Sequence, residues 1–194
     1  MIVLASRSFI RVKLLRDAGV AFDADAADLD EDALVAGIAD PAAQASSLAR
    51  AKALHVAPRH KGVFVVGGDQ VGVLDDGSTL RKPLHRDDHV ALLLSMSGRT
   101  HRFYPAACLV KDDVVFGEVS DVVAVTFRSF GRKTAEALVA TGEGSGSCGG
   151  YESENRGAQL IERVDGNLHA ILGFPLLRVL ALLRVHCPVE AALL

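Results

Sequence analysis

The strongest strand signal in the chain is Val63-Phe64-Val65-Val66-Gly67-Gly68-Asp69-Gln70. Its four leading apolar residues, three of them β-branched, lack helical spacing and favour a buried strand. Two glycines and a carboxylate follow directly. Because a carboxylate at the end of a buried strand usually faces the sheet edge where ligands bind, Asp69 is the first candidate for chemistry. The plain alternative is that Asp69 lies in a turn and bonds to its own backbone.

Strand and helix signals alternate on both sides of this stretch. Ser8 is a typical helix cap and Gly19 a typical stop, whereas Pro41 and Pro58 delimit a second helix. The acidic run from Asp28 to Asp32 is expected to be a loop. We expect further helices at about 86–96, 132–140 and within 170–185, and strands at 2–5, 20–25, 71–74, 100–110, 114–127 and 159–163.

The order of these elements predicts the fold class. Alternating strands and helices with a central hairpin, turning at 111–113, indicate an α/β fold with a mixed, twisted sheet flanked by helices. The chain of 194 residues suits a single domain over 1–194. We find no internal repeat, linker or low-complexity block.

Composition and charge exclude several classes of protein. A net charge of -3 gives no general reason to bind nucleic acid or an anionic membrane. The most apolar stretch, 170–185, contains a proline, a glycine and two arginines, so it does not suit a membrane span. We expect it to be a strand end followed by a buried C-terminal helix. Cys108, Cys148 and Cys187 form neither a zinc motif nor a disulfide framework, which favours reduced thiols and a cytoplasmic location.

A turn that opens a helix at Ser6-Arg7-Ser8-Phe9-Ile10-Arg11 is the second candidate site. Helix N-termini bind phosphates, and Ser8 and Arg11 lie three residues apart on one helix face. A hydroxyl and a guanidinium there could clamp a phosphate chain. The alternative is an ordinary capped helix with a solvated arginine.

Four scattered charges form a third, weaker candidate: Asp30, Glu31, Lys52 and Lys82. Oxygen ligands suit Mg²⁺ and lysines suit phosphate charge. Singly, each is typical of a solvated surface, and only its spatial position could promote Lys52. The glycine-rich run 142–150 lacks the Lys-Ser/Thr ending of a P-loop, so we expect a mobile loop near a ligand. His85 and His89 could chelate a metal only with a third ligand.

Taken together, these pieces resemble the Maf family of nucleoside triphosphate pyrophosphatases. The resemblance runs from residue 2 to about 184 and depends on the joint order of its motifs. The matching segments are Leu4-Ala5-Ser6-Arg7-Ser8 with Arg11, Asp30-Glu31, Ala51-Lys52-Ala53, Gly68-Asp69-Gln70-Val71, Lys82-Pro83, Ser97-Gly98-Arg99-Thr100-His101, Gly150-Tyr151 with Glu154 and Gly157, and Gly173-Phe174-Pro175-Leu176.

The resemblance implies a two-lobed fold around a central cleft, like that of the inosine-triphosphate pyrophosphatase group. It implies cleavage of a nucleoside triphosphate to the monophosphate and pyrophosphate, with Mg²⁺ or Mn²⁺ as the divalent cofactor. Asp69 matches the general base, and Glu31 matches an acidic residue associated with metal and catalysis. We expect both to be metal ligands. Ser8, Arg11, Lys52 and Lys82 match the positions that handle phosphates, and Lys52 is also expected to be catalytic.

Ile10, Gln70 and Glu154 match positions tied to base selectivity in the family. The pair Asp69-Gln70 with Glu154 looks like the branch that takes 7-methyl-GTP, because a carboxylate can accept hydrogen bonds from a guanine and suits a methylated, positively charged base. Ile10 departs from that branch, where an aromatic residue is usual.

Two other functions are weighed against catalysis. A non-catalytic, nucleotide-sensing regulator of septum formation is one, because overproduction in this family is associated with arrested cell division. The other is an RNA-binding module, which is disfavoured because the chain lacks a basic stripe and any tryptophan. The resemblance also implies a house-cleaning role and allows a homodimer.

Overall fold

A computed structural model of the chain describes residues 1–187, so residues 188–194 of the expected domain lie outside it. The chain divides into two compact units, each built from separate stretches of sequence. The first unit comprises Met1–Gln70, Tyr104–Asp121 and the segment from Leu168 onward. The second comprises Val71–Phe103 and Val122–Asn167.

The elements of the first unit alternate as the sequence predicts. They are β1 (Ile2–Ala5), α1 (Phe9–Asp17), β2 (Phe22–Ala24), α2 (Glu31–Val35), α3 (Pro41–Val56), η1 (Ala57–Arg59), the first part of β3 (Phe64–Leu74), the second part of β5 (Thr100–Lys111), β6 (Val114–Ser120), α6 (Leu168–Ile171) and α7 (Leu176–His186). The second unit adds β4 (Thr79–Leu80), α4 (Arg86–Met96), β7 (Val123–Phe127), α5 (Arg132–Val139), η2 (Arg156–Leu160) and β8 (Ile161–Gly166).

The sheet is mixed, as predicted. Its main strand order is β2-β1-β3-β5-β7-β8, with β4 beside β3 and β6 beside β5. Strand β1 runs parallel to both β2 and β3. The other registered pairs, β3–β4, β5–β6, β5–β7 and β7–β8, are antiparallel. The α/β class with a mixed sheet flanked by helices is therefore confirmed.

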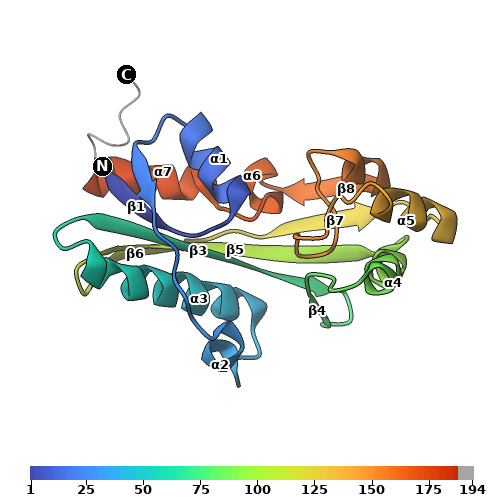
Figure 1. The fold of residues 1–194 in the computed structure, drawn as a ribbon, viewed down its shortest axis with the longest axis horizontal. Coiled ribbons are helices and arrows are strands. Elements are labelled where there is room, and N and C mark those ends of the chain that lie inside the picture. The colour runs from blue at the N-terminus through green and yellow to red at the C-terminus, as the bar shows by residue number, and fades with distance from the viewer. Residues whose placement is uncertain (188–194) are drawn as a thin grey trace. The chain divides into compact units, whose positions relative to one another are not determined.

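Helices cover both faces of the sheet within the first unit. Figure 1 shows α1 and α7 on one face and α3 on the other. The α1–α7 face holds a core of fully buried side chains, among them Leu4, Leu15, Phe174 and Leu183. Alternate residues of a strand face opposite sides, so β1 and β3 contribute to both layers.

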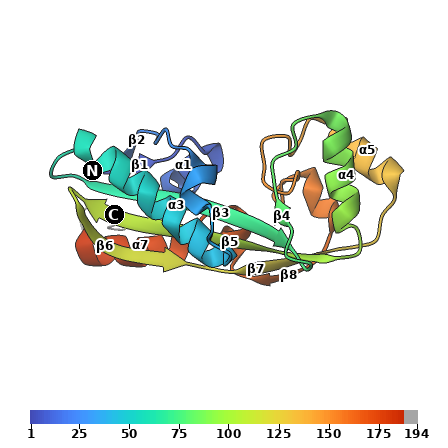
Figure 2. The same cartoon turned by 90° about the horizontal axis from the view of Figure 1, so that it is seen from below.

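The second unit has its own core beneath α4 and α5, which pack against each other (Figure 2). Its fully buried side chains include Leu93, Met96, Phe127, Leu160 and His101. Ring contacts join His101 to Phe103, Phe127 and Tyr151 with centroid distances of 5.3, 4.8 and 5.5 Å.

Three local predictions are wrong. The acidic run is only partly a loop, because Asp30 accepts a hydrogen bond from Ala33 N and so caps the short helix α2. The second hairpin arm is two strands, β6 and β7, each of which pairs with a different part of β5. The apolar stretch from Ala170 begins in helix α6, not at a strand end. Within residues 1–187, no helix has both the length and the apolar character to cross a membrane.

Candidate active site

A backbone contact between β3 and α3 sets the position of Asp69. A Cβ atom added to Gly67 would lie 2.0 Å from Ala49 O and 2.7 Å from Ala53 N, so only glycine lets the helix approach the strand this closely. Asp69 is two residues farther along β3 and therefore faces the same helix. Lys52 lies three residues after Ala49, on the helix face that meets the strand.

Lys52 and Asp69 form a buried ion pair at this contact. Lys52 Nζ lies 2.5 Å from Asp69 Oδ1, and the two side chains are only 11% and 10% exposed. The same Nζ lies 2.7 Å from Glu31 Oε1 at the start of α2, whose side chain is 52% exposed. One ammonium group thus joins two carboxylates from separate elements. The structure thereby gives Lys52 the spatial position that the sequence left undecided.

Asp69 lies within a strand and not at its end. The sequence predicts that the strand ends over Gly67–Gln70 and that 71–74 is a further extended segment, but β3 continues unbroken from Phe64 to Leu74. The two glycines serve close packing on opposite faces, because a Cβ at Gly68 would lie 2.9 Å from the Phe174 ring. The Asp69 side chain is on the α3 face, where it pairs with Lys52.

A second cation, Arg11, lies within electrostatic reach of this cluster. Its Nε donates to Gly173 O at 3.0 Å, and its Nη1 donates to Ser6 Oγ at 3.4 Å. Burial lowers the pKa of the guanidinium, and the charges of Asp69 and Glu31 act in the opposite direction. Two cations and two carboxylates of the first unit therefore form one interacting group.

Ser8 caps helix α1. Its Oγ accepts from Arg11 N at 3.5 Å, while Ser8 N donates to Ser6 Oγ at 3.1 Å. The plain capping role that the sequence left open is thus present. The Arg11 side chain extends to Ser6 and Gly173, partners that the sequence analysis did not identify. Gly173 has a φ of +88°, which favours glycine. Its position in the sequence Gly173-Phe174-Pro175 was the sequence signal that could have indicated a special backbone conformation there.

The expected base-selective residues of the first unit lie close to the same segment. Gln70 Nε2 donates to Ala170 O at 3.2 Å. A Cβ at Gly173 would lie 3.1 Å from Gln70 Oε1. Ile10 is half-buried and packs against the core on the α1–α7 face. Both side chains are thus held by the first unit itself.

Lys82 and Glu154 belong to the second unit. Lys82 is exposed in the segment between β4 and α4. Glu154 is exposed in the turn before η2, where its Oε2 accepts from Ser153 Oγ at 3.3 Å.

His89, which the sequence offers as a possible metal ligand, is buried, and its Nε2 donates to Gly150 O at 2.5 Å. That bond gives His89 a structural role in place of chelation.

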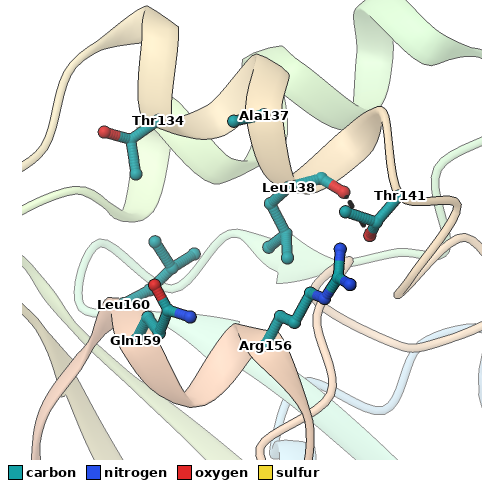
Figure 3. A pocket seen from close by; sticks show the side chains of 7 residues that line it. All are labelled: Thr134, Ala137, Leu138, Thr141, Arg156, Gln159 and Leu160. Atoms are coloured by element: carbon teal, nitrogen blue, oxygen red, sulfur yellow. Dashed lines mark hydrogen bonds between the residues drawn. The ribbon is translucent and has the colours of Figure 1, made fainter.

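A shallow pocket of the second unit lies between α5 and η2 (Figure 3). Leu138 and Leu160 form its apolar part, and the Arg156 side chain extends along it. Thr141 Oγ1 is occupied by a hydrogen bond of 2.7 Å to Leu138 O. None of the predicted site residues lines this pocket, so it is separate from the Asp69 cluster.

The metal prediction can be examined from the donor set. Among residues 1–187, no three His, Cys, Asp or Glu side chains converge as a metal cage would require. Glu31 and Asp69 supply two carboxylates that already share one cation, the Lys52 ammonium. Mg²⁺ is commonly held by one or two carboxylates together with substrate phosphates. This pair therefore fits an ion that is completed by phosphate oxygens.

A family model described as Maf-like protein matches residues 1–186 of the chain. The chain belongs to the Maf family. A relative of this Maf protein from Nitrobacter hamburgensis, named nucleoside triphosphate pyrophosphatase, is 38% identical over 94% of the chain and 92% of its own length. Another from Rhizobium johnstonii, named 7-methyl-GTP pyrophosphatase, is 39% identical over 94% of each chain.

Solved structures resemble the Maf protein more distantly. A HAM1 protein from Coxiella burnetii is 17% identical, with a TM-score of 0.45 over 63% of this chain and 69% of its own. The Ham1 protein of Staphylococcus aureus is 11% identical, with a TM-score of 0.44 over 65% of this chain and 71% of its own.

Proposed function

We propose that this Maf protein is a nucleoside triphosphate pyrophosphatase, which hydrolyses a nucleoside triphosphate to the monophosphate and pyrophosphate. The observation that carries the proposal is the buried contact of Lys52 with Asp69, joined by Glu31. Removing two charged groups from water costs free energy that their mutual attraction often does not offset, so a buried ion pair is seldom explained by stability alone. A buried, paired set of charged side chains is therefore a candidate functional site.

Asp69 is the proposed general base. Its Oδ1 binds Lys52 Nζ, and its second oxygen is left to accept a proton from the attacking water. Attack of the water oxygen at the α-phosphorus forms the new P–O bond and breaks the bond from the α-phosphorus to the α,β-bridging oxygen, which leaves with the β- and γ-phosphates as pyrophosphate. The hydrogen bond from Lys52 Nζ fixes the orientation of the Asp69 carboxylate, which a general base needs.

The cations of the cluster are proposed to offset the charge of the phosphates. Lys52 and Arg11 both interact with carboxylates of the first unit, so the triphosphate would exchange one set of anionic partners for another. Ser8 at the N-terminus of α1 and Lys82 in the second unit are proposed to bind phosphate oxygens as well. Fixed cations at the reacting phosphate provide most of the rate gain in phosphoryl chemistry.

Glu31 and Asp69 are the proposed ligands of a divalent cation, Mg²⁺ or Mn²⁺. When bound, such an ion neutralises phosphate charge and polarises the phosphorus. Until then, Lys52 is the cation that satisfies both carboxylates.

Ile10, Gln70 and Glu154 are the proposed base-selective residues, and 7-methyl-GTP is the proposed preferred substrate. A glutamate carboxylate can accept hydrogen bonds from the N1–H and the amino group of guanine, and it favours the positive charge of the methylated base. The Rhizobium johnstonii relative that bears this activity in its name supports the assignment.

Pyrophosphate release from a panel of nucleotides tests the proposal. The panel contains the canonical triphosphates, including UTP and dTTP, together with the modified nucleotide 7-methyl-GTP. Each is assayed with Mg²⁺, with Mn²⁺ and with neither metal. We expect metal-dependent release, fastest with 7-methyl-GTP. Binding without hydrolysis of any nucleotide would overturn the proposal in favour of a nucleotide-sensing regulator.

Asp69→Asn tests the general base directly. The amide keeps the size of the side chain but cannot take the proton, so we expect turnover to fall by about 100- to 10,000-fold while nucleotide binding is kept. The matched control is Asp17→Asn, because Asp17 is an exposed partner of Lys13 on α1. Calorimetric binding and pyrophosphate release check both variants, and near-normal turnover of Asp69→Asn would refute the role.

A further inference from the structure

The turn Tyr151–Gly157, which we call the Glu154 loop, is fastened at both ends within the second unit. At its start, the Tyr151 hydroxyl and His101 Nε2 share a hydrogen bond of 2.8 Å. The preceding carbonyl, Gly150 O, accepts from His89 Nε2 at 2.5 Å. Tyr151 is buried and contacts the Phe127 ring at a centroid distance of 4.8 Å. These contacts join the start of the loop to the core of the unit.

The other end of the loop is held by Glu143. Its Oε1 accepts from Gly157 N at 2.6 Å, and its Oε2 accepts from Arg156 N at 3.0 Å. Both N–H groups open η2, where the backbone has no partner inside the helix. Bonds from backbone N–H groups to an ionised carboxylate are about twice as strong as neutral ones. Glu143 N itself donates to Thr141 Oγ1 at 3.2 Å, which places the clamp relative to α5.

Between the two fastenings the loop is closed tightly. A Cβ at Gly157 would lie 2.6 Å from Glu152 O, so the turn leaves room only for glycine. Glu152 Oε2 accepts from Asn155 Nδ2 at 2.7 Å. Glu154 is exposed between these internal bonds. A carboxylate that is exposed on a fixed backbone is suited to meet a ligand in one defined position.

We infer that Glu143 is a specificity-positioning residue, which holds the Glu154 loop so that Glu154 can select the base. The inference rests on the proposed function, because it gives Glu154 its role in that reaction. Glu143 itself touches the Arg156 and Gly157 amides and not the reacting atoms. It lies in the glycine-rich run 142–150, which the sequence predicts to be a mobile loop near a ligand. In the structure, this run contains the carboxylate that binds the Arg156 and Gly157 amides.

Glu143→Gln tests the clamp because one carboxylate oxygen is replaced by an amide NH2 group, which cannot accept a hydrogen bond from the backbone N–H that it faces. We expect faster hydrogen exchange at the Arg156 and Gly157 amides. Glu136→Gln is the matched control, since Glu136 lies in α5 of the same unit and pairs with Arg132 at 3.5 Å. The control should leave both amides unchanged. Unchanged exchange in Glu143→Gln would overturn the inference.

Selectivity provides the functional readout. The ratio of kcat/KM for 7-methyl-GTP to that for UTP should fall about tenfold in Glu154→Gln, by loss of charged hydrogen bonds. Glu143→Gln should lower the same ratio through KM for 7-methyl-GTP, and Glu143→Asp should restore part of it. The double variant should be no worse than Glu154→Gln alone, because both changes remove one interaction.

The outcomes separate the two ideas. If the unaltered protein hydrolyses no nucleotide in the panel, the proposed function fails. If it hydrolyses them and Glu143→Gln leaves the ratio intact, or the two substitutions multiply, the positioning inference alone fails.

Discussion

Lys52 is the single residue that pairs with both carboxylates of the cluster, Asp69 and Glu31. Its stem is buried in α3, and its ammonium is the partner of a carboxylate that is almost as buried. Glu31 shares it from a more exposed position. Removing one partner of a buried pair is far more costly than removing both, because the remaining charge has neither water nor a partner.

Lys52→Gln should therefore lower the free energy of unfolding by about 3 kcal/mol, as expected for an uncompensated buried carboxylate. Urea unfolding measures it. Lys13→Gln is the matched control, because Lys13 and Asp17 are 52% and 55% exposed, and surface pairs contribute less than about 1 kcal/mol. The double variant Lys52→Gln/Asp69→Asn should regain part of the loss. Equal effects of the two single variants would contradict this account.

The sequence could single out Asp69 but could not show its partner. Asp69 follows an apolar run, which is a local signal, whereas Lys52 looks like a solvated charge beside Arg50 in the sequence. The contact between Lys52 and Asp69 depends on the close approach of Gly67 to Ala49. These two residues are far from each other in the sequence, and neither has a functional group in its side chain. The family resemblance supplied Lys52 as a candidate, and only the packing of α3 on β3 supplies the physical reason.

At the scale of elements, the close approach of α3 to β3 is the contact on which the cluster depends. Gly67→Ala would insert a methyl group against backbone atoms that cannot rotate away. We expect a loss of about 3 kcal/mol in the free energy of unfolding, at the upper end of overpacking, together with loss of nucleotide turnover.

The matched control is Gly146→Ala, since an added Cβ at Gly146 meets no atom within 4 Å. Its unfolding free energy should stay within about 0.5 kcal/mol of the original. Chemical unfolding and pyrophosphate release are measured on both. A Gly67→Ala protein with unchanged stability would show that α3 and β3 do not pack as described.

Local signals predicted most elements well because caps and apolar periods act over a few residues. Ser8, Gly19 and Pro41 mark the ends of α1 and α3 as expected. The errors arise where tertiary pairing decides. Residues 114–127 look like one strand, yet β6 and β7 separate because each pairs with a different part of β5.

For the whole molecule, acid should weaken the fold through His101. Burial lowers the pKa of its imidazole to about 4, below the ordinary value of 6.5. Between pH 6.5 and 4 the unfolded chain takes up a proton that the folded protein does not. Stability from this group is therefore complete above pH 6.5 and is lost as the pH falls to about 4, by roughly 3 kcal/mol.

His101→Phe should flatten the decline of the unfolding free energy between pH 6.5 and 4. His55→Gln, at an exposed position of α3, should keep the slope of the original protein. Asp25 has a lowered pKa, chiefly because of the hydrogen bond from Arg59, and acts below its ordinary value of 3.8, outside this window. An unchanged slope in His101→Phe would assign the acid sensitivity to another group.

The division into two units was implied by the family resemblance, but the residues alone did not assign any segment to either unit. Asp69 belongs to the first unit and Lys82 and Glu154 to the second, whereas the family resemblance implies a role for all three in one reaction. Long-range pairing of β3 and β5 with separate partners decides this division, and no local pattern records it.

The hydrogen bonds of Arg11 to Gly173 O and of Gln70 to Ala170 O join segments that the ribosome synthesises at different times. Arg11 precedes both carbonyls in the chain, and the carbonyls belong to the last of the three stretches that make up the first unit. A nascent chain can already contain Asp69, Lys52 and Glu31 while the arginine still lacks its anchor. The charged cluster can thus be completed only after Gly173 has been translated, so a chain terminated before that residue would carry the charges without the arrangement.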